Sequence, residues 1–121
     1  MATGERASGR RFDRDHGVTT HALLFLGELD PTANREALSH ATHYEAVPVA
    51  AFAALMAQIP QSFVRQATFV DVGAGMGRAV LLASEYPFKQ VIGVELSRAL
   101  AEIARENLQT AHDFAIRCRD V

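Results

Sequence analysis

The sequence predicts an α/β fold built around a parallel β-sheet. Two short apolar runs, Thr68 to Val72 and Val91 to Val94, have the length of buried strands. A helical pattern over Arg78 to Ser84 separates them, and a second helical pattern over Ser97 to Leu108 follows. Phe114 to Arg119 has the pattern of a third strand. This alternation is typical of a parallel sheet with right-handed crossovers.

The segment before the sheet is predicted to contain helices. The apolar run Ala46 to Ala57 contains Pro48, which suits a first helical turn, and Pro60 is expected to end the element. The run is much shorter than the roughly 20 residues of a membrane span, so we expect no membrane association. One apolar face is expected to pack in the core and contains Phe52, Leu55, Met56 and Ile59.

Met1 to Arg14 is polar and rich in arginine, which predicts a flexible tail without a secretory signal. We therefore divide the chain into a tail (1–15), an N-terminal helical or lid segment (16–66) and a ligand-binding α/β half-domain (67–121).

The composition is that of an ordinary globular protein. The chain has 121 residues, of which 49% are hydrophobic, so it forms one domain at most. Its 12 basic and 14 acidic residues give a formal charge of -2, which provides no general nucleic-acid or membrane-surface signal. A lone cysteine, Cys118, has no internal disulfide partner, and this favours a cytoplasmic location. His40 and His43 lack a third clear ligand, so we predict no metal site.

A glycine-rich loop, D-V-G-A-G-M-G, follows the first predicted strand. Gly73 and Gly75 allow a sharp turn and a close approach of ligand to backbone amides, and Gly77 is expected to let the next helix pack closely on the sheet. A dinucleotide fingerprint would need glycine or alanine where Arg78 stands. A Walker-type loop would need a lysine, and the only lysine is the distant Lys89. The loop therefore disfavours NAD and nucleoside triphosphates.

Two acids end the two predicted strands, Asp71 in the first and Glu95 after the second. Asp71 would repel a pyrophosphate but attract an ammonium group. Glu95 has the position of an acid that accepts hydrogen bonds from a ribose diol. An adenosine ligand with a free ribose and an amino-acid tail is S-adenosylmethionine. The alternative is that both acids cap neighbouring helices.

The segments D-V-G-A-G-M-G and V-I-G-V-E-L-S resemble motif I and the following acidic motif of class I S-adenosylmethionine-dependent methyltransferases. The pattern is also similar to the histone-lysine methyltransferases of this fold, but it is shared too widely to assign lysine as acceptor. The resemblance implies that Asp71, Gly73 and Gly75 contact the methionine portion, in a loop with Ala74 and Gly77. It also implies that Glu95 takes the ribose hydroxyls, Leu96 lies beside the adenine, Asp120 meets the adenine amino group and Tyr44 lies against the cofactor.

The resemblance further implies a Rossmann-like, seven-stranded sheet of the class I type. This chain would supply its first three strands, preceded by N-terminal helices. The residues for catalysis and for binding the acceptor would then lie beyond Val121. Protein, small-molecule and RNA acceptors all stay open. We expect no methyl transfer by this polypeptide alone, and self-association through the exposed edge of the first strand. The alternatives are a catalytically inactive module that binds S-adenosylmethionine or another adenosine and, less favoured, an NAD-dependent oxidoreductase.

Overall fold

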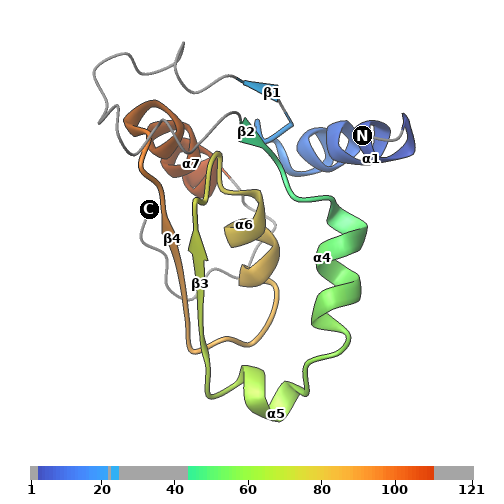
Figure 1. The fold of residues 1–121 in the computed structure, drawn as a ribbon, viewed down its shortest axis with the longest axis vertical. Coiled ribbons are helices and arrows are strands. Elements are labelled where there is room, and N and C mark those ends of the chain that lie inside the picture. The colour runs from blue at the N-terminus through green and yellow to red at the C-terminus, as the bar shows by residue number, and fades with distance from the viewer. Residues whose placement is uncertain (1–2, 22, 25–43, 111–121) are drawn as a thin grey trace.

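The computed structural model describes residues 3–21, 23–24 and 44–110 (Figure 1). None of the helices in these ranges is long and apolar enough to cross a membrane. In chain order the elements are α1 (Thr3–His16), β1 (Leu23–Leu24), β2 (Tyr44–Glu45), α4 (Val49–Met56), α5 (Gln61–Val64), β3 (Thr68–Val72), α6 (Arg78–Ser84), β4 (Gln90–Val94) and α7 (Arg98–Thr110).

The α/β class and the parallel strand pair are confirmed. Strands β3 and β4 pair in parallel, from Thr68 opposite Gln90 to Val72 opposite Val94. Helix α6 connects them and has the predicted bounds. Strands β1 and β2 form a separate antiparallel pair. The predicted third strand, Phe114 to Arg119, lies outside the described residues.

Helix α6 lies between the two parallel strands and α4 (Figure 1). Its Val80, Leu81 and Ala83 are fully buried, as expected for a helix that packs on a sheet and is covered by a second helix. Aromatic rings continue this core, because Phe69 of β3 contacts Phe52 of α4 with ring centroids 5.9 Å apart. The core thus fixes the strand ends and the loop between β3 and α6.

The predicted helix over this run is present as α4, but Pro48 is its N-cap and not part of its first turn, and its apolar face is narrower than expected. Phe52 and Met56 are buried, whereas Leu55 is exposed. The helix is only two turns long and buries the side chains that lie four residues apart. Pro60 does not merely end the element, because it is the N-cap of α5.

The prediction of a flexible tail over residues 1–15 is wrong, since Thr3–His16 form helix α1. Phe12 is buried, and the Arg78 guanidinium lies 5.4 Å from the centre of its ring. The Asp13 carboxylate accepts hydrogen bonds from the backbone N–H groups of Thr20 and His21, at 2.8 and 2.6 Å. These contacts connect α1 to distant parts of the chain, which a local reading of its polar sequence does not reveal.

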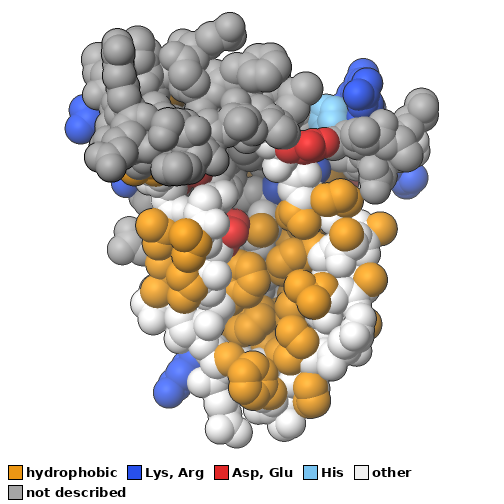
Figure 2. All heavy atoms as spheres, viewed as in Figure 1, with side chains coloured by type: hydrophobic (Ala, Val, Ile, Leu, Met, Phe, Trp, Pro, Cys, Tyr) orange, Lys and Arg blue, Asp and Glu red, His pale blue; other side chains and the backbone are white. Residues whose placement is uncertain are grey.

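One face of the β3–β4 pair exposes apolar side chains. Val70, Val72 and Val94 are 51%, 82% and 51% exposed, whereas Phe69 and Asp71, which alternate with them, are partly buried. Figure 2 shows a group of hydrophobic side chains over the strands, apart from those that lie over α4. Parallel sheets are normally covered on both faces. We propose that the exposed face and edge of β3 support self-association.

Val72→Lys is expected to weaken this self-association, because an edge lysine opposes strand-to-strand pairing. Sedimentation velocity over a range of concentrations measures the effect. Leu55→Lys is the matched control, since it places the same charge on an exposed apolar site of α4. If both variants weakened self-association equally, or if the wild-type chain stayed monomeric at every concentration, a specific role of β3 in self-association would be contradicted.

Candidate functional site

The glycine loop is anchored on the end of the neighbouring strand. The backbone N–H groups of Gly73 and Ala74 both donate to the carbonyl oxygen of Val94, at 2.8 and 2.9 Å. The Gly77 N–H donates to the Ala74 carbonyl oxygen at 2.9 Å. These amides already donate hydrogen bonds inside the protein, so they are not free to donate to a ligand. The loop mainly provides space for a ligand. This corrects the expectation that ligand would lie against bare amides, and it further disfavours a bound pyrophosphate, which needs such donors.

Three glycines of the loop have backbone angles that favour glycine. Gly73, Gly75 and Gly77 have φ of 85°, 57° and 93°. A Cβ on Gly73 would meet nothing within 4 Å, so this residue borders open space. A Cβ on Gly77 would lie 3.3 Å from the Ala104 Cβ. Gly77 therefore permits the close approach of α7, where the sequence had suggested close packing of α6 on the sheet.

Glu95 joins the second strand to the glycine loop. Its Oε2 atom accepts a hydrogen bond from the backbone N–H of Gly75, and its Oε1 atom accepts one from the backbone N–H of Ser97, both at 2.7 Å. Each carboxylate oxygen has a further lone pair, so both remain able to accept a ligand hydroxyl. The capping role at α7 belongs to Ser97, whose Oγ accepts the Leu100 N–H at 3.3 Å. Leu96, beside Glu95, is 53% exposed and offers an apolar surface.

Asp71 is a partly buried carboxylate next to this loop. Burial raises the pKa of Asp71 above its ordinary value, and the negative charge of Glu95 raises this pKa further. Among the described residues it has no ion-pair partner. An ionised carboxylate in such surroundings is stabilised by a cation, so the site suits a positively charged ligand group.

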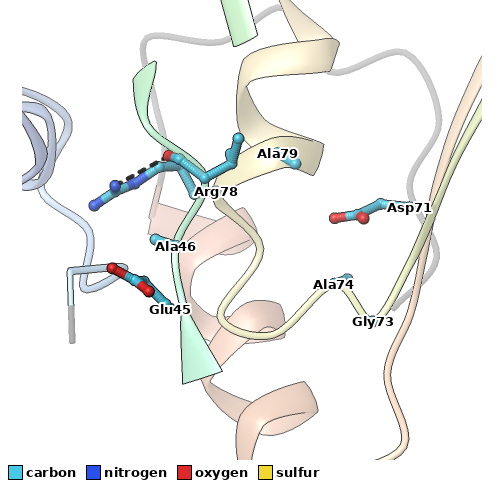
Figure 3. Close-up of a pocket in the computed structure, with 8 residues that line it drawn as sticks. Glu45, Ala46, Asp71, Gly73, Ala74, Arg78 and Ala79 are labelled. Carbon is cyan, nitrogen blue, oxygen red and sulfur yellow. Dashed lines mark hydrogen bonds between the residues drawn. The ribbon is translucent and has the colours of Figure 1, made fainter. Parts of the chain in front are cut away.

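Asp71 lines a pocket of about 180 Å³ between β2, β3 and α6. Figure 3 shows its carboxylate extending from β3, with Glu45 of β2 on the other side of the pocket. The Asp71 carboxylate faces a small space bordered by open backbone at Gly73, whereas the carboxylate of the exposed Glu45 is directed away from Asp71 (Figure 3). Sequence reasoning had not assigned Glu45 to the site. The lining residues are Glu45, Ala46, Val47, Asp71, Gly73, Ala74, Arg78 and Ala79.

The structure does not reach every predicted site residue. The backbone of Tyr44 lies in β2, next to the pocket residue Glu45, whereas its side chain is outside the described part. Asp120, His40 and His43 also lie outside the described residues. In the described ranges, no three histidine, cysteine or acidic side chains group as metal ligands.

Two buried polar residues at the loop were not identified from the sequence as site residues. Arg78 is only 3% exposed, and its Nε donates to Thr20 Oγ1 at 2.8 Å. Asn107 of α7 donates from Nδ2 to the Met76 carbonyl oxygen at 2.8 Å and so holds the loop. The signal for Arg78 was an arginine at the start of the apolar helix R-A-V-L-L-A. Asn107 gave no comparable signal.

A protein-family model described as "Histone methylation protein DOT1" matches residues 39–117 of the chain. The matched range contains β2, the glycine loop, Glu95 and α7, whereas α1 precedes it. No curated protein gives a significant match.

Proposed function

Because the chain belongs to the histone methylation protein DOT1 family, a family of class I S-adenosylmethionine-dependent methyltransferases, we propose that its glycine loop and neighbouring acids bind S-adenosylmethionine. The observation that supports this proposal best is the contact of Glu95 with the Gly75 amide. This contact brings the acid that follows β4 to the loop that follows β3. A ligand that binds both the acid and the loop requires this proximity.

The ribose is assigned to Glu95. Hydrogen bonds from two backbone N–H groups fix its carboxylate in place. The remaining lone pairs of the carboxylate suit two vicinal hydroxyls. A carboxylate at this position disfavours a phosphorylated ribose. Leu96 would then lie beside the adenine, and Asp120 and Tyr44 would complete the adenosine contacts.

The amino-acid end is assigned to the pocket of Asp71. The open space at Gly73 admits a chain of atoms, with Ala74, Gly75 and Gly77 shaping the loop around it. The Asp71 carboxylate faces this pocket and suits an ammonium group. The loop amides already have partners, so the recognition of this end relies on the Asp71 carboxylate and on shape.

S-adenosylmethionine supplies a methyl carbon made electrophilic by its sulfonium. The chain's own contribution is to hold adenosine and amino-acid ends apart at fixed positions, which orients the methyl group for an in-line transfer. We propose a protein lysine of a histone as the acceptor, on the description of the family.

Calorimetric titration tests the cofactor assignment. We expect S-adenosylmethionine to bind and NAD to give no heat of binding at the same concentrations, because Asp71 and the occupied amides oppose a pyrophosphate. Tight binding of NAD without binding of S-adenosylmethionine would overturn the proposal.

The acceptor is tested with tritiated S-adenosylmethionine and core histones. Methyl-lysine as the labelled product would support the histone assignment. Label recovered in a small molecule or nucleic acid would contradict the histone assignment.

Asp71→Asn is expected to weaken S-adenosylmethionine binding by roughly 1.5–3 kcal/mol, the range for hydrogen bonds to a charged group. It is also expected to stabilise the ligand-free fold at neutral pH. The folded-state pKa of Asp71 is raised, so its ionisation costs stability above that pKa, and the cost disappears below the unfolded value of 3.8. The stability difference between variant and wild type should therefore narrow as the pH falls through this window.

Denaturant unfolding at several pH values and calorimetry at neutral pH measure the two effects. Asp15→Asn is the control, since Asp15 is an exposed acid paired with Arg11 on α1. Unchanged affinity in a folded Asp71→Asn variant would contradict the role given to Asp71.

A further inference from the structure

The side chain of Arg78 connects three segments that are distant in the sequence. Besides Thr20, its guanidinium donates from Nη1 to the Val47 carbonyl oxygen and from Nη2 to the Gly9 carbonyl oxygen, each at 3.3 Å. Asp13 supplies the counter-charge, with its Oδ1 atom 3.6 Å from Nη2. Arg78 is also the first residue of α6 and lines the pocket of Asp71. The pocket wall is thus connected directly to α1.

Thr20 and Asp13 complete this network on the N-terminal side. The Thr20 hydroxyl donates to Asp13 Oδ1 and accepts from Arg78 Nε. Thr20 is fully buried, and its N–H and that of His21 donate to Asp13 Oδ2. Within the described residues no buried side-chain nitrogen or oxygen lacks a partner, so the network is satisfied only when α1 is docked.

Asn107 makes a second connection between the N-terminal segment and the glycine loop. Its Oδ1 accepts the Thr19 N–H at 2.9 Å, and its Nδ2 donates to the Thr19 carbonyl oxygen at 2.7 Å. The same Nδ2 holds the Met76 carbonyl oxygen in the loop. One side chain therefore contacts both the N-terminal segment and the loop.

These two connections, here called the N-terminal clamp, consist of Gly9, Asp13, Thr19 and Thr20 bound to Arg78 and Asn107. The first four residues lie before the range matched by the family model, which starts at residue 39. They fall outside the lining of the pocket. The clamp can therefore affect a ligand only through the pocket wall and the loop.

We propose that the N-terminal clamp couples the docking of residues 9–21 to S-adenosylmethionine binding, with Arg78 and Asn107 as positioning residues. When the segment undocks, Arg78 loses Asp13, Thr20 and Gly9 together, and its guanidinium is left at the pocket wall without its counter-charge. That charge opposes a cationic ligand, and the Val47 wall and the Met76 carbonyl lose their fixed positions. Since coupling is reciprocal, bound ligand must in turn stabilise the docked segment.

Hydrogen exchange in the wild-type chain measures the coupling between segment docking and ligand binding without any substitution. The Thr19 amide donates to Asn107 Oδ1 across the clamp at 2.9 Å and exchanges when the clamp opens. Saturating S-adenosylmethionine is expected to slow this exchange about tenfold, within the usual range of couplings between sites. The Lys89 amide, bonded to the Ala67 carbonyl oxygen at the opposite end of the strands, is the internal control for local opening.

Thr20→Val and Thr20→Ser form the matched pair of variants. Valine keeps the shape but removes the hydroxyl, so affinity measured by calorimetry is expected to fall about tenfold. Serine keeps the hydroxyl and is expected to restore both affinity and ligand-induced protection. A general loss of stability would not give this pattern, because the Lys89 exchange rate would change as well.

The inference rests on the proposed function, and the outcomes separate the two. A wild-type chain that does not bind S-adenosylmethionine would overturn both. A wild-type chain that binds it, but shows unchanged exchange at the Thr19 amide and equal affinity in Thr20→Val, would overturn the coupling alone. Slower exchange on binding, with weaker binding in Thr20→Val and rescue by serine, would support it.

Discussion

Gly75→Val is expected to abolish S-adenosylmethionine binding. Gly75 is buried and has a φ of 57°, a left-handed conformation that costs an ordinary residue roughly 1–2 kcal/mol and a β-branched residue more. Its N–H also holds Glu95, so a shift of this backbone displaces the acid assigned to the ribose. The variant therefore removes both the shape of the loop and the position of Glu95.

Calorimetry measures the loss of binding, and thermal unfolding reports whether the variant is folded. Gly4→Val is the control, because a Cβ at this position of α1 would meet nothing within 4 Å. A folded Gly75→Val variant with wild-type affinity would mean that the ligand binds elsewhere.

Glu95→Ala is expected to weaken binding by roughly 1.5–3 kcal/mol, the range for hydrogen bonds to a charged group. The substitution removes the acceptor of the ribose hydroxyls and leaves the Gly75 and Ser97 amides without their partner. Glu95→Gln is expected to lose affinity too, because its amide nitrogen cannot accept from either backbone N–H.

Glu102→Ala provides a control on the exposed face of α7 and is expected to bind as the wild type does. Equal affinities of the Glu95 and Glu102 variants would refute the ribose assignment. Titrations with S-adenosylmethionine on samples matched for folded fraction make the comparison.

The elements that local patterns define were predictable from the sequence. The first strand and α6 have the predicted bounds, and α7 differs from its prediction by one residue at the start and two at the end. The approach of Glu95 to Gly75 was also foreseeable, because parallel neighbouring strands bring their carboxyl ends together. These features depend on short-range periodicity and on one right-handed crossover.

The features that the sequence did not predict depend on long-range polar contacts. Helix α1 was expected to be a flexible tail because it is polar, yet Arg78 donates to the Gly9 carbonyl oxygen of α1 across 69 residues. Asn107 contacts Thr19 across 88 residues. Glu45 belongs to the pocket only because β2 lies beside α6 in space. No local pattern records such pairings, since each depends on the folded position of both partners.

A crystal structure of the chain with S-adenosylhomocysteine tests the central claim most directly. We predict that both ribose hydroxyls donate to the Glu95 carboxylate, that the adenine lies against Leu96 and that the ammonium group lies in the pocket of Asp71. A ligand bound away from the glycine loop, or one whose ribose does not contact Glu95, would contradict the assignment of this site.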